Sequence, residues 1–219
     1  MFKKFKSGTD IRGIAAEGVV GENITLTDDV VCRITDAFAL WISNKLEKLP
    51  TDIKISVGHD SRISAQRIKR CVVKTLVSRG FNVIDCALAS TPSMFMTTLD
   101  LDCDAAIQIT ASHHPFNRNG LKFFTKQGGL EGKDIEKILS IASTDEVLST
   151  SSGSVTEINY MKQYSANLRK MIIDCVNSED DREKPLKNYH IVVDAGNGAG
   201  GFYATEVLAP LGADISGSQ

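Results

Sequence analysis

The chain has 219 residues, of which 42% are hydrophobic and 24% charged, and its formal net charge is -2. This is an ordinary globular profile, and the near-neutral charge excludes a strong overall attraction to nucleic acid or to a membrane surface. No apolar run approaches membrane-spanning length, and the basic start MFKKFKSG leads into no apolar core or cleavage site. The five scattered cysteines, with no close Cys-x-x-Cys pair, are typical of reduced thiols, so we expect a cytoplasmic protein.

The first two thirds of the chain alternate strand and helix patterns. Strands are expected at residues 53–57, 81–86, 105–109 and 121–124, and helices between Thr27 and Pro50, between Arg62 and Gly80, from Thr91 through Leu99, and from Lys133 to Ala142. Such alternation indicates an α/β domain with a sheet layered between helices. Because the 121–124 strand follows its predecessor after a loop without a helix, we expect the sheet to be mixed.

Between Ser143 and Val155 the composition becomes small and polar, which predicts a linker between a domain at 1–150 and an incomplete domain at 151–219. A helix over 157–176 and the charged loop NSEDDREKP follow. A strand at 189–193 then leads through a glycine-rich turn into a helix near residues 207–211.

Three glycines of that turn, Gly196, Gly198 and Gly201, match the spacing of a dinucleotide-binding fingerprint, and Asp214 lies where a ribose-binding acid is sought. A lone fingerprint is a weak signal, and the sequence ends before a second mononucleotide-binding half is complete. We favour the structural interpretation, in which the glycines allow close packing of a strand against a helix.

The segment 107–124, IQITASHHPFNRNGLKFF, is a strand that ends in a polar loop. Ser112 is a hydroxyl nucleophile beside His113, and Lys122 follows a turn at Asn119 and Gly120 that could fold it back over the serine. An oxygen that carries a phosphoryl group, a proton acceptor and a fixed cation are the parts of phosphoryl transfer. The residues alone leave two alternatives open: surface histidines, and a serine that caps the next segment.

Two further loops contribute candidate residues. Arg12 lies between Gly8 and Gly13, where the backbone can turn tightly and aim the arginine into a cleft, although the residues alone favour a solvated arginine in a plain turn. Asp60 and Arg62 follow a strand, at the edge of an α/β sheet where ligands bind. We expect these two residues to pair and to brace the serine loop.

These motifs resemble a known family. The run Thr110-Ala111-Ser112-His113-His114-Pro115, followed by Asn119-Gly120-Leu121-Lys122, is similar to the active-site serine loop of the α-D-phosphohexomutases, the phosphoglucomutase and phosphomannomutase family. The segments 8–13 (GTDIRG), 57–62 (VGHDSR) and 193–200 (VDAGNGAG) match the same family in order. His114 departs from it, because asparagine is commoner there, and we assign it no role.

The resemblance implies a mutase that moves phosphate between the 1- and 6-positions of a hexose phosphate through a hexose 1,6-bisphosphate. Ser112 would carry the phosphoryl group, His113 a proton, and Arg12 and Lys122 positive charge, while Asp60, Arg62 and Asn119 would support the loop. It also implies Mg²⁺, bound in part through the phosphoryl oxygen on Ser112. The family's metal, sugar and phosphate loops lie in further domains, so we expect a first domain plus the opening of a second, inactive alone.

A different class of function stays open. The chain could be a self-standing, non-catalytic module that binds phosphosugars or a partner protein through the serine loop. A serine hydrolase is poorly supported, because Ser112 lacks the glycine-flanked nucleophile elbow. Neither the residues nor the resemblance tells which hexose phosphate is bound.

Overall fold

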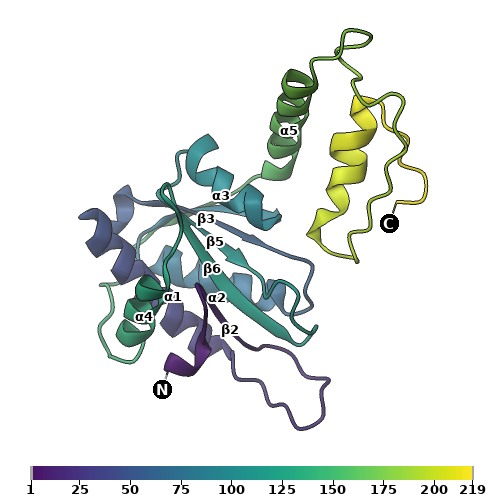
Figure 1. The fold of residues 1–219 in the computed structure, drawn as a ribbon. Coiled ribbons are helices and arrows are strands. Elements are labelled where there is room, and N and C mark those ends of the chain that lie inside the picture. The colour runs from purple at the N-terminus through teal and green to yellow at the C-terminus, as the bar shows by residue number, and fades with distance from the viewer. Residues whose placement is uncertain (1, 219) are drawn as a thin grey trace. The chain divides into compact units, whose positions relative to one another are not determined.

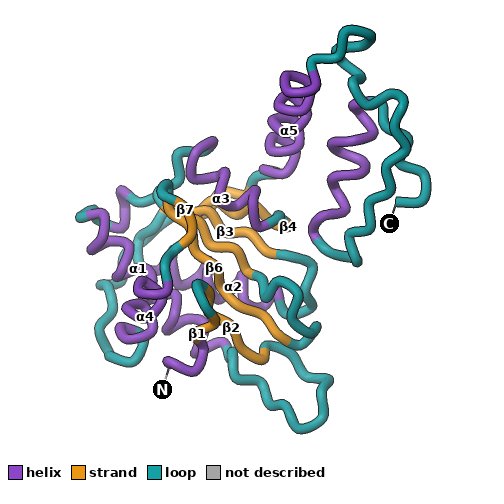
Figure 2. Tube along the Cα trace, viewed as in Figure 1, coloured by secondary structure: helices purple, strands orange, loops and turns teal. Residues whose placement is uncertain are grey.

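The computed structural model describes residues 2–218 and divides into two compact units, one ending at Ile158 and one beginning at Asn159 (Figure 1). The first unit is built on a single sheet whose strands run in the order β1-β2-β6-β5-β3-β4-β8, with β7 paired to β6 (Figure 2). The strands are β1 Lys6–Ser7, β2 Asp10–Ile14, β3 Lys54–His59, β4 Asn82–Leu88, β5 Ala105–Ile109, β6 Arg118–Thr125, β7 Gly128–Gly129 and β8 Ser154–Glu157.

The predicted mixed sheet is confirmed. β3 is parallel to β4 and to β5, whereas β6 is antiparallel to both of its long neighbours, β5 and β2. A loop without a helix joins β5 to β6, and such a connection returns the chain in the opposite direction along the sheet. The carboxyl ends of β3, β4 and β5 therefore meet the start of β6 at one edge.

Helices cover both faces of this sheet. The helices α1 Asp28–Leu46, α2 Ala65–Ser78 and α4 Gly132–Ile141 share one hydrophobic core with the sheet, in which Phe38 of α1 stacks on Phe123 of β6 with 4.4 Å between ring centroids. Val57 belongs to that core, so its neighbour Gly58 faces the other side, where Met94 of α3 (Thr91–Asp100) packs against it.

Two helix predictions need correction. α1 begins at the predicted cap, because the Thr27 hydroxyl accepts the Val30 N–H, but it ends at Leu46 rather than at Pro50. Glu47 adopts a left-handed backbone and closes the helix with its own N–H. Leu99, expected on the buried side of α3, is 51% exposed.

The predicted linker contains a strand. Residues 154–157 form β8, which runs parallel to β4, and the N–H of Ile158 donates to Asp85. The first compact unit consequently continues to Ile158. The domain boundary near residue 150 stays a prediction for the whole protein.

The second unit contains α5, Tyr160–Val176, and three short helical turns, Ala199–Gly201, Tyr203–Leu208 and Ala209–Leu211. The strand predicted at 189–193 is wrong for the described residues, because only a single bridge, His190 to Asp214, forms there. The helix predicted near 207–211 is of π type up to Leu208 and of 3-10 type from Ala209 to Leu211, where Pro210 has no N–H to donate. Across residues 2–218, no helix is long and apolar enough to cross a membrane.

Candidate active site

The candidate site lies at the edge where β3 and β5 end. The N–H of Asp60 donates to the carbonyl of Ile109 at 3.0 Å, so the loop after β3 begins beside the loop after β5. We call residues 60–64 the β3–α2 loop and residues 110–119 the serine loop. Parallel strands carry their ligand-binding loops at this edge, which accounts for the meeting of the two.

Ser112 stands exposed at a corner of the serine loop, next to the fully buried Ala111. Its backbone is left-handed, with φ of 55°, a conformation that residues other than glycine adopt only at a cost in conformational free energy. Its N–H donates to the hydroxyl of Thr110 at 2.9 Å, and its own hydroxyl lies 3.4 Å from Nδ1 of His113. The corner thus presents a serine hydroxyl within reach of an imidazole.

Arg62 holds the middle of the serine loop. Its guanidinium donates to four backbone carbonyls: Ser112 at 2.6 Å, His114 at 2.7 Å, Pro115 at 2.7 Å and Arg118 at 2.9 Å. The Arg62 side chain is only 11% exposed, and its Nε lies 3.3 Å from a carboxylate oxygen of Asp60. The expected pairing of Asp60 with Arg62 is present, and most of the arginine's hydrogen bonds go to the loop.

At the two ends of the serine loop, the expected supporting residues Asp60 and Asn119 bond to Thr110 and Ser64, two residues to which the sequence analysis assigned no part. The Thr110 hydroxyl donates to Asp60 Oδ2 at 2.7 Å, and Asn119 Nδ2 donates to the Ser64 hydroxyl at 2.9 Å. Asn119 is fully buried, and its side-chain oxygen accepts the N–H of Gly120. No local pattern in the sequence signals these two contacts, because their partners lie 50 and 55 positions apart in the chain.

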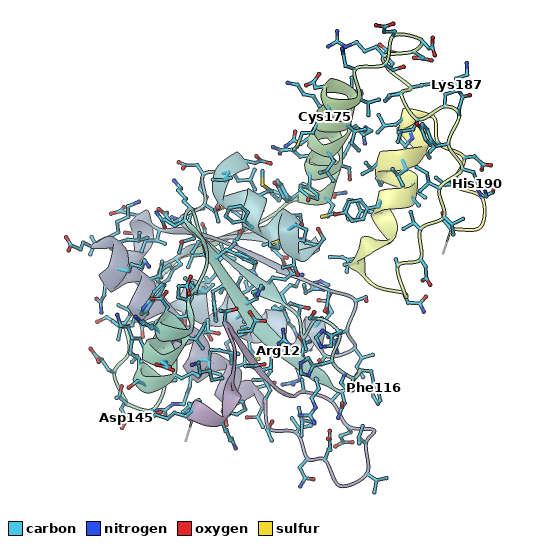
Figure 3. All side chains as sticks on the ribbon, in the orientation of Figure 1. Arg12, Phe116, Asp145, Cys175, Lys187 and His190 are labelled. Carbon is cyan, nitrogen blue, oxygen red and sulfur yellow. The ribbon has the colours of Figure 1, made fainter. Side chains whose placement is uncertain are left out.

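Arg12 and Lys122 are brought together by a third residue, Asp10. One carboxylate oxygen of Asp10 accepts from Arg12 at 2.7 Å and the other from Lys122 at 2.6 Å. Asp10 is 5% exposed, while both cations reach water in part. Two cations on one carboxylate leave net positive charge on this face of β2 and β6. Figure 3 labels Arg12 of β2 and Phe116 of the serine loop, both in the first unit.

Gly120 is needed for this arrangement. It lies opposite Arg12 in the β2–β6 register, and a Cβ there would overlap the carbonyl oxygen of Ile11 and approach Cγ of Arg12 to 2.9 Å. The bare backbone of Gly120 leaves room for the arginine side chain to cross β6.

His114, to which the sequence analysis assigned no role, also lies near positively charged side chains. Partial burial lowers the pKa of His114, and the charges of Arg12, His113, Arg118 and Arg62 lower it further. Its ring lies 5.2 Å from that of His113.

The described residues do not form a magnesium site. Among residues 2–218, no group of three or more His, Cys, Asp or Glu side chains is arranged to hold a metal ion. The acids beside the serine loop, Asp60 and Asp10, are engaged with arginine and lysine side chains. Mg²⁺ requires several oxygen ligands in near-octahedral geometry, and Ser112 offers one position at most.

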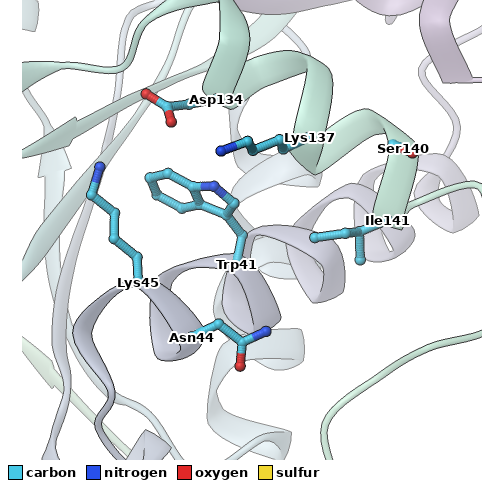
Figure 4. A pocket seen from close by; sticks show the side chains of 7 residues that line it. All are labelled: Trp41, Asn44, Lys45, Asp134, Lys137, Ser140 and Ile141. Atoms are coloured by element: carbon cyan, nitrogen blue, oxygen red, sulfur yellow. The ribbon is translucent and has the colours of Figure 1, made fainter.

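A hollow with a volume of about 510 Å³ lies elsewhere, between α1 and α4. Figure 4 shows the indole of Trp41 between the side chains of Lys45 and Lys137, and the Lys45 ammonium lies 4.8 Å from the indole centroid. No residue of the serine loop lines it. Its residues fit the surface groove of a packed helix pair better than a catalytic cleft.

Comparison with known proteins gives a consistent result. The family model described as phosphoglucomutase/phosphomannomutase, alpha/beta/alpha domain I, matches residues 3–148. The phosphoglucosamine mutase of Campylobacter curvus is 36% identical over 210 residues, which cover 95% of this chain and 44% of that protein. The phosphoglucosamine mutase of Helicobacter pylori strain G27 is 34% identical over 201 residues, covering 91% and 44%.

Solved structures share the fold. A phosphoglucomutase/phosphomannomutase family protein from Burkholderia thailandensis superposes with a TM-score of 0.74 at 26% identity, over 95% of this chain and 42% of that one. Parafusin, a phosphoglucomutase from Paramecium, gives 0.68 at 17% identity, over 97% and 43%. The chain therefore spans less than half the length of the relatives it matches.

Proposed function

The chain belongs to the phosphoglucomutase/phosphomannomutase family, and from this premise we propose that it is the serine-loop part of a phosphohexomutase. The observation that carries the proposal is Ser112, an exposed hydroxyl on a left-handed corner, 3.4 Å from an imidazole nitrogen. In the complete protein, this isomerase moves phosphate between the 1- and 6-positions of a hexose phosphate.

Ser112 carries the phosphoryl group in this proposal. Phosphorylated Ser112 gives its phosphoryl group to the free hydroxyl of the hexose phosphate, which yields the hexose 1,6-bisphosphate and a free serine. The bisphosphate turns over, and the Ser112 oxygen attacks the phosphorus of its other phosphate. The bond from that phosphorus to the sugar oxygen breaks, and the sugar oxygen leaves as a hydroxyl that takes up the proton given up by the serine. His113 Nδ1, the imidazole atom nearest that oxygen, takes the serine proton in this return step.

Arg12 and Lys122 supply fixed positive charge in the proposal. Asp10 neutralises one of the two charges and holds both side chains, so a single net charge remains beside the transferring group. Preorganised cations stabilise the charge that develops on phosphoryl oxygens, because they need no reorganisation during the reaction. Asp60, Arg62 and Asn119 support the loop and make no contact with the substrate.

We propose Mg²⁺ as a cofactor of the complete protein, with the phosphoryl oxygen on Ser112 as one ligand. The described residues supply no such site, so no step above runs through the metal. The remainder of a longer polypeptide is the partner that would supply further ligands. All five cysteines are free, which supports a reducing, cytoplasmic compartment.

For the substrate we propose a phosphoglucosamine, because two relatives that are 36% and 34% identical over more than nine tenths of this chain are phosphoglucosamine mutases. The test uses the complete polypeptide that contains this chain, assayed with glucosamine 6-phosphate and with glucose 1-phosphate and mannose 1-phosphate as competitors. Faster turnover of either competitor would contradict the substrate and leave the mutase proposal in place.

The mechanism is tested by Ser112→Ala, which should lower turnover at least about a thousandfold, because the covalent intermediate cannot form. The matched control is Ser152→Ala at an exposed serine, which should retain normal turnover. Mass spectrometry should find phosphate on the Ser112 peptide of the wild type alone. Phosphosugar binding without turnover by the wild type would favour the non-catalytic module instead.

A further inference from the structure

The β3–α2 loop contacts the serine loop along its whole length through alternate residues. Asp60 accepts from Thr110 at the start, Arg62 donates to four carbonyls in the middle, and Ser64 accepts from Asn119 at the end. Asp60 also accepts the backbone N–H of Arg62 at 3.1 Å, which fixes the β3–α2 loop itself. The β3–α2 loop thus serves as a template for the serine loop, because its hydrogen bonds fix the start, the middle and the end of that loop.

Both peptide groups of Ser112 are held by this template. Its N–H donates to Thr110, whose hydroxyl in turn donates to Asp60, and its carbonyl accepts from Arg62. A strained backbone conformation persists only where its surroundings over-determine it. The left-handed φ of Ser112 meets that condition through contacts that all lead back to Asp60 and Arg62.

Arg62 is suited to this task in a way that lysine is not. A guanidinium is planar and offers several N–H groups in a rigid fork, whereas an ammonium is a compact charge with three donors on a flexible stem. Arg62 uses two nitrogens for four carbonyls, and its charge faces Asp60 in a largely buried setting. A lysine at this position cannot reach all four carbonyls from one point.

We propose that Arg62 is a positioning residue for the phosphoryl transfer: by bonding the carbonyls of the serine loop, it holds Ser112 left-handed and its hydroxyl aligned with His113. The inference rests on the proposed function for its catalytic consequence. Its conformational part, the hold on the loop, does not depend on that function.

The experiment compares Arg62→Lys with Arg67→Lys in the complete polypeptide. Arg67 is a suitable control, because it also bonds two backbone carbonyls, Ala15 and Leu26, but none in the serine loop. For Arg62→Lys we expect kcat to fall about a hundredfold while KM changes less than about threefold, since misplacing a reacting group costs rate rather than binding. Arg67→Lys should keep kcat within about twofold.

Two readouts separate positioning from general loss of structure. Amide exchange in Arg62→Lys should rise at least about tenfold at residues 112–114. The unfolding temperatures of Arg62→Lys and Arg67→Lys should differ by no more than a few degrees. Residues 117 and 118 should change less, because Glu22 holds the side chains of Asn117 and Arg118 independently. In Arg62→Ala, added guanidinium ion should restore kcat several-fold, and it should have no such effect on Arg67→Ala.

The inference is overturned if Arg62→Lys keeps both wild-type kcat and wild-type exchange at residues 112–114, or if the two variants behave alike. A wild type without mutase activity, or an active Ser112→Ala, contradicts the proposed function instead. In that case the exchange measurement alone still decides whether Arg62 holds the loop.

Discussion

The serine loop and the glycine-rich turn at 194–201 both follow segments whose sequences predict strands, yet the two loops differ in the contacts that hold them. The serine loop is held from outside, by the β3–α2 loop and by strands on both sides of β5. The glycine-rich turn has hydrogen bonds between its own residues: the N–H of Gly196 donates to the Asp194 carboxylate, and the N–H of Gly198 donates to the carbonyl of Ala195. The difference teaches that a fixed side-chain geometry, as phosphoryl transfer requires, comes from long-range contacts rather than from turn-forming residues.

Strand partners explain the contrast. β5 is central in the sheet and pairs with β3 and β6 along its full length, whereas residues 189–193 share one bridge with Asp214. The fingerprint of a dinucleotide site needs a strand before its glycines and a helix after them. In the described part of the second unit, neither element takes that form, so the dinucleotide interpretation loses its structural context.

Of the substitutions that test this comparison, Gly120→Ala should have the largest effect, a loss of folding stability. The added methyl overlaps the backbone of Ile11, so β2 and β6 must separate, and we expect a loss of about 3 kcal/mol in the free energy of unfolding. Urea denaturation of the variant measures it. Gly129→Ala is the matched control, because the nearest atom to its new methyl is 3.8 Å away, and it should cost less than about 1 kcal/mol.

Lys122→Ala should affect catalysis more than folding. Removing one of the two cations that Asp10 holds should lower kcat/KM about a hundredfold, as expected for the loss of one preorganised charge. Lys126→Ala on the neighbouring turn, whose lysine pairs with the exposed Asp102, should change it less than about twofold. Equal losses in the two variants would mean that surface charge in general, rather than the Asp10 cluster, matters.

Gly196→Ala should have a smaller, purely local effect. Nothing lies within 4 Å of the added methyl, so only the left-handed φ of 53° is penalised, by about 1 kcal/mol. Amide exchange of the 194–201 segment reports it. A cost as large as that of Gly120→Ala would show that this turn is also held by distant contacts, against the comparison drawn above.

The smallest effect should be a change in pH dependence at His114. Its folded-state pKa is lowered, so below the unfolded value of about 6.5 the unfolded chain binds more protons and stability falls as pH decreases. Above that value the histidine is neutral in both states and contributes nothing to the slope. His114→Asn should therefore reduce the loss of thermal stability between pH 7 and pH 5; an unchanged slope would contradict this account.

Much of the first unit could be predicted from the sequence. Strand 105–109, the Thr27 cap, the mixed sheet and the serine loop all follow from local patterns, in which residues a few positions apart decide the outcome. The family resemblance rested on such contiguous motifs and is confirmed by the family model over residues 3–148. Local chemistry also indicated that Asp60 and Arg62 would pair.

Only the tertiary structure decided how the site is held together. Asp10 and Lys122 are 112 positions apart, and Arg62 reaches carbonyls 50 to 56 positions away, so no local pattern encodes either contact. Strand pairing also decided the structure of residues 154–157 and 189–193. Residues 154–157 pair with β4 along their whole length, whereas residues 189–193 form a single bridge with Asp214. A sequence determines which segments are able to form strands and loops, but backbone hydrogen bonds need partners, and distant parts of the chain supply them.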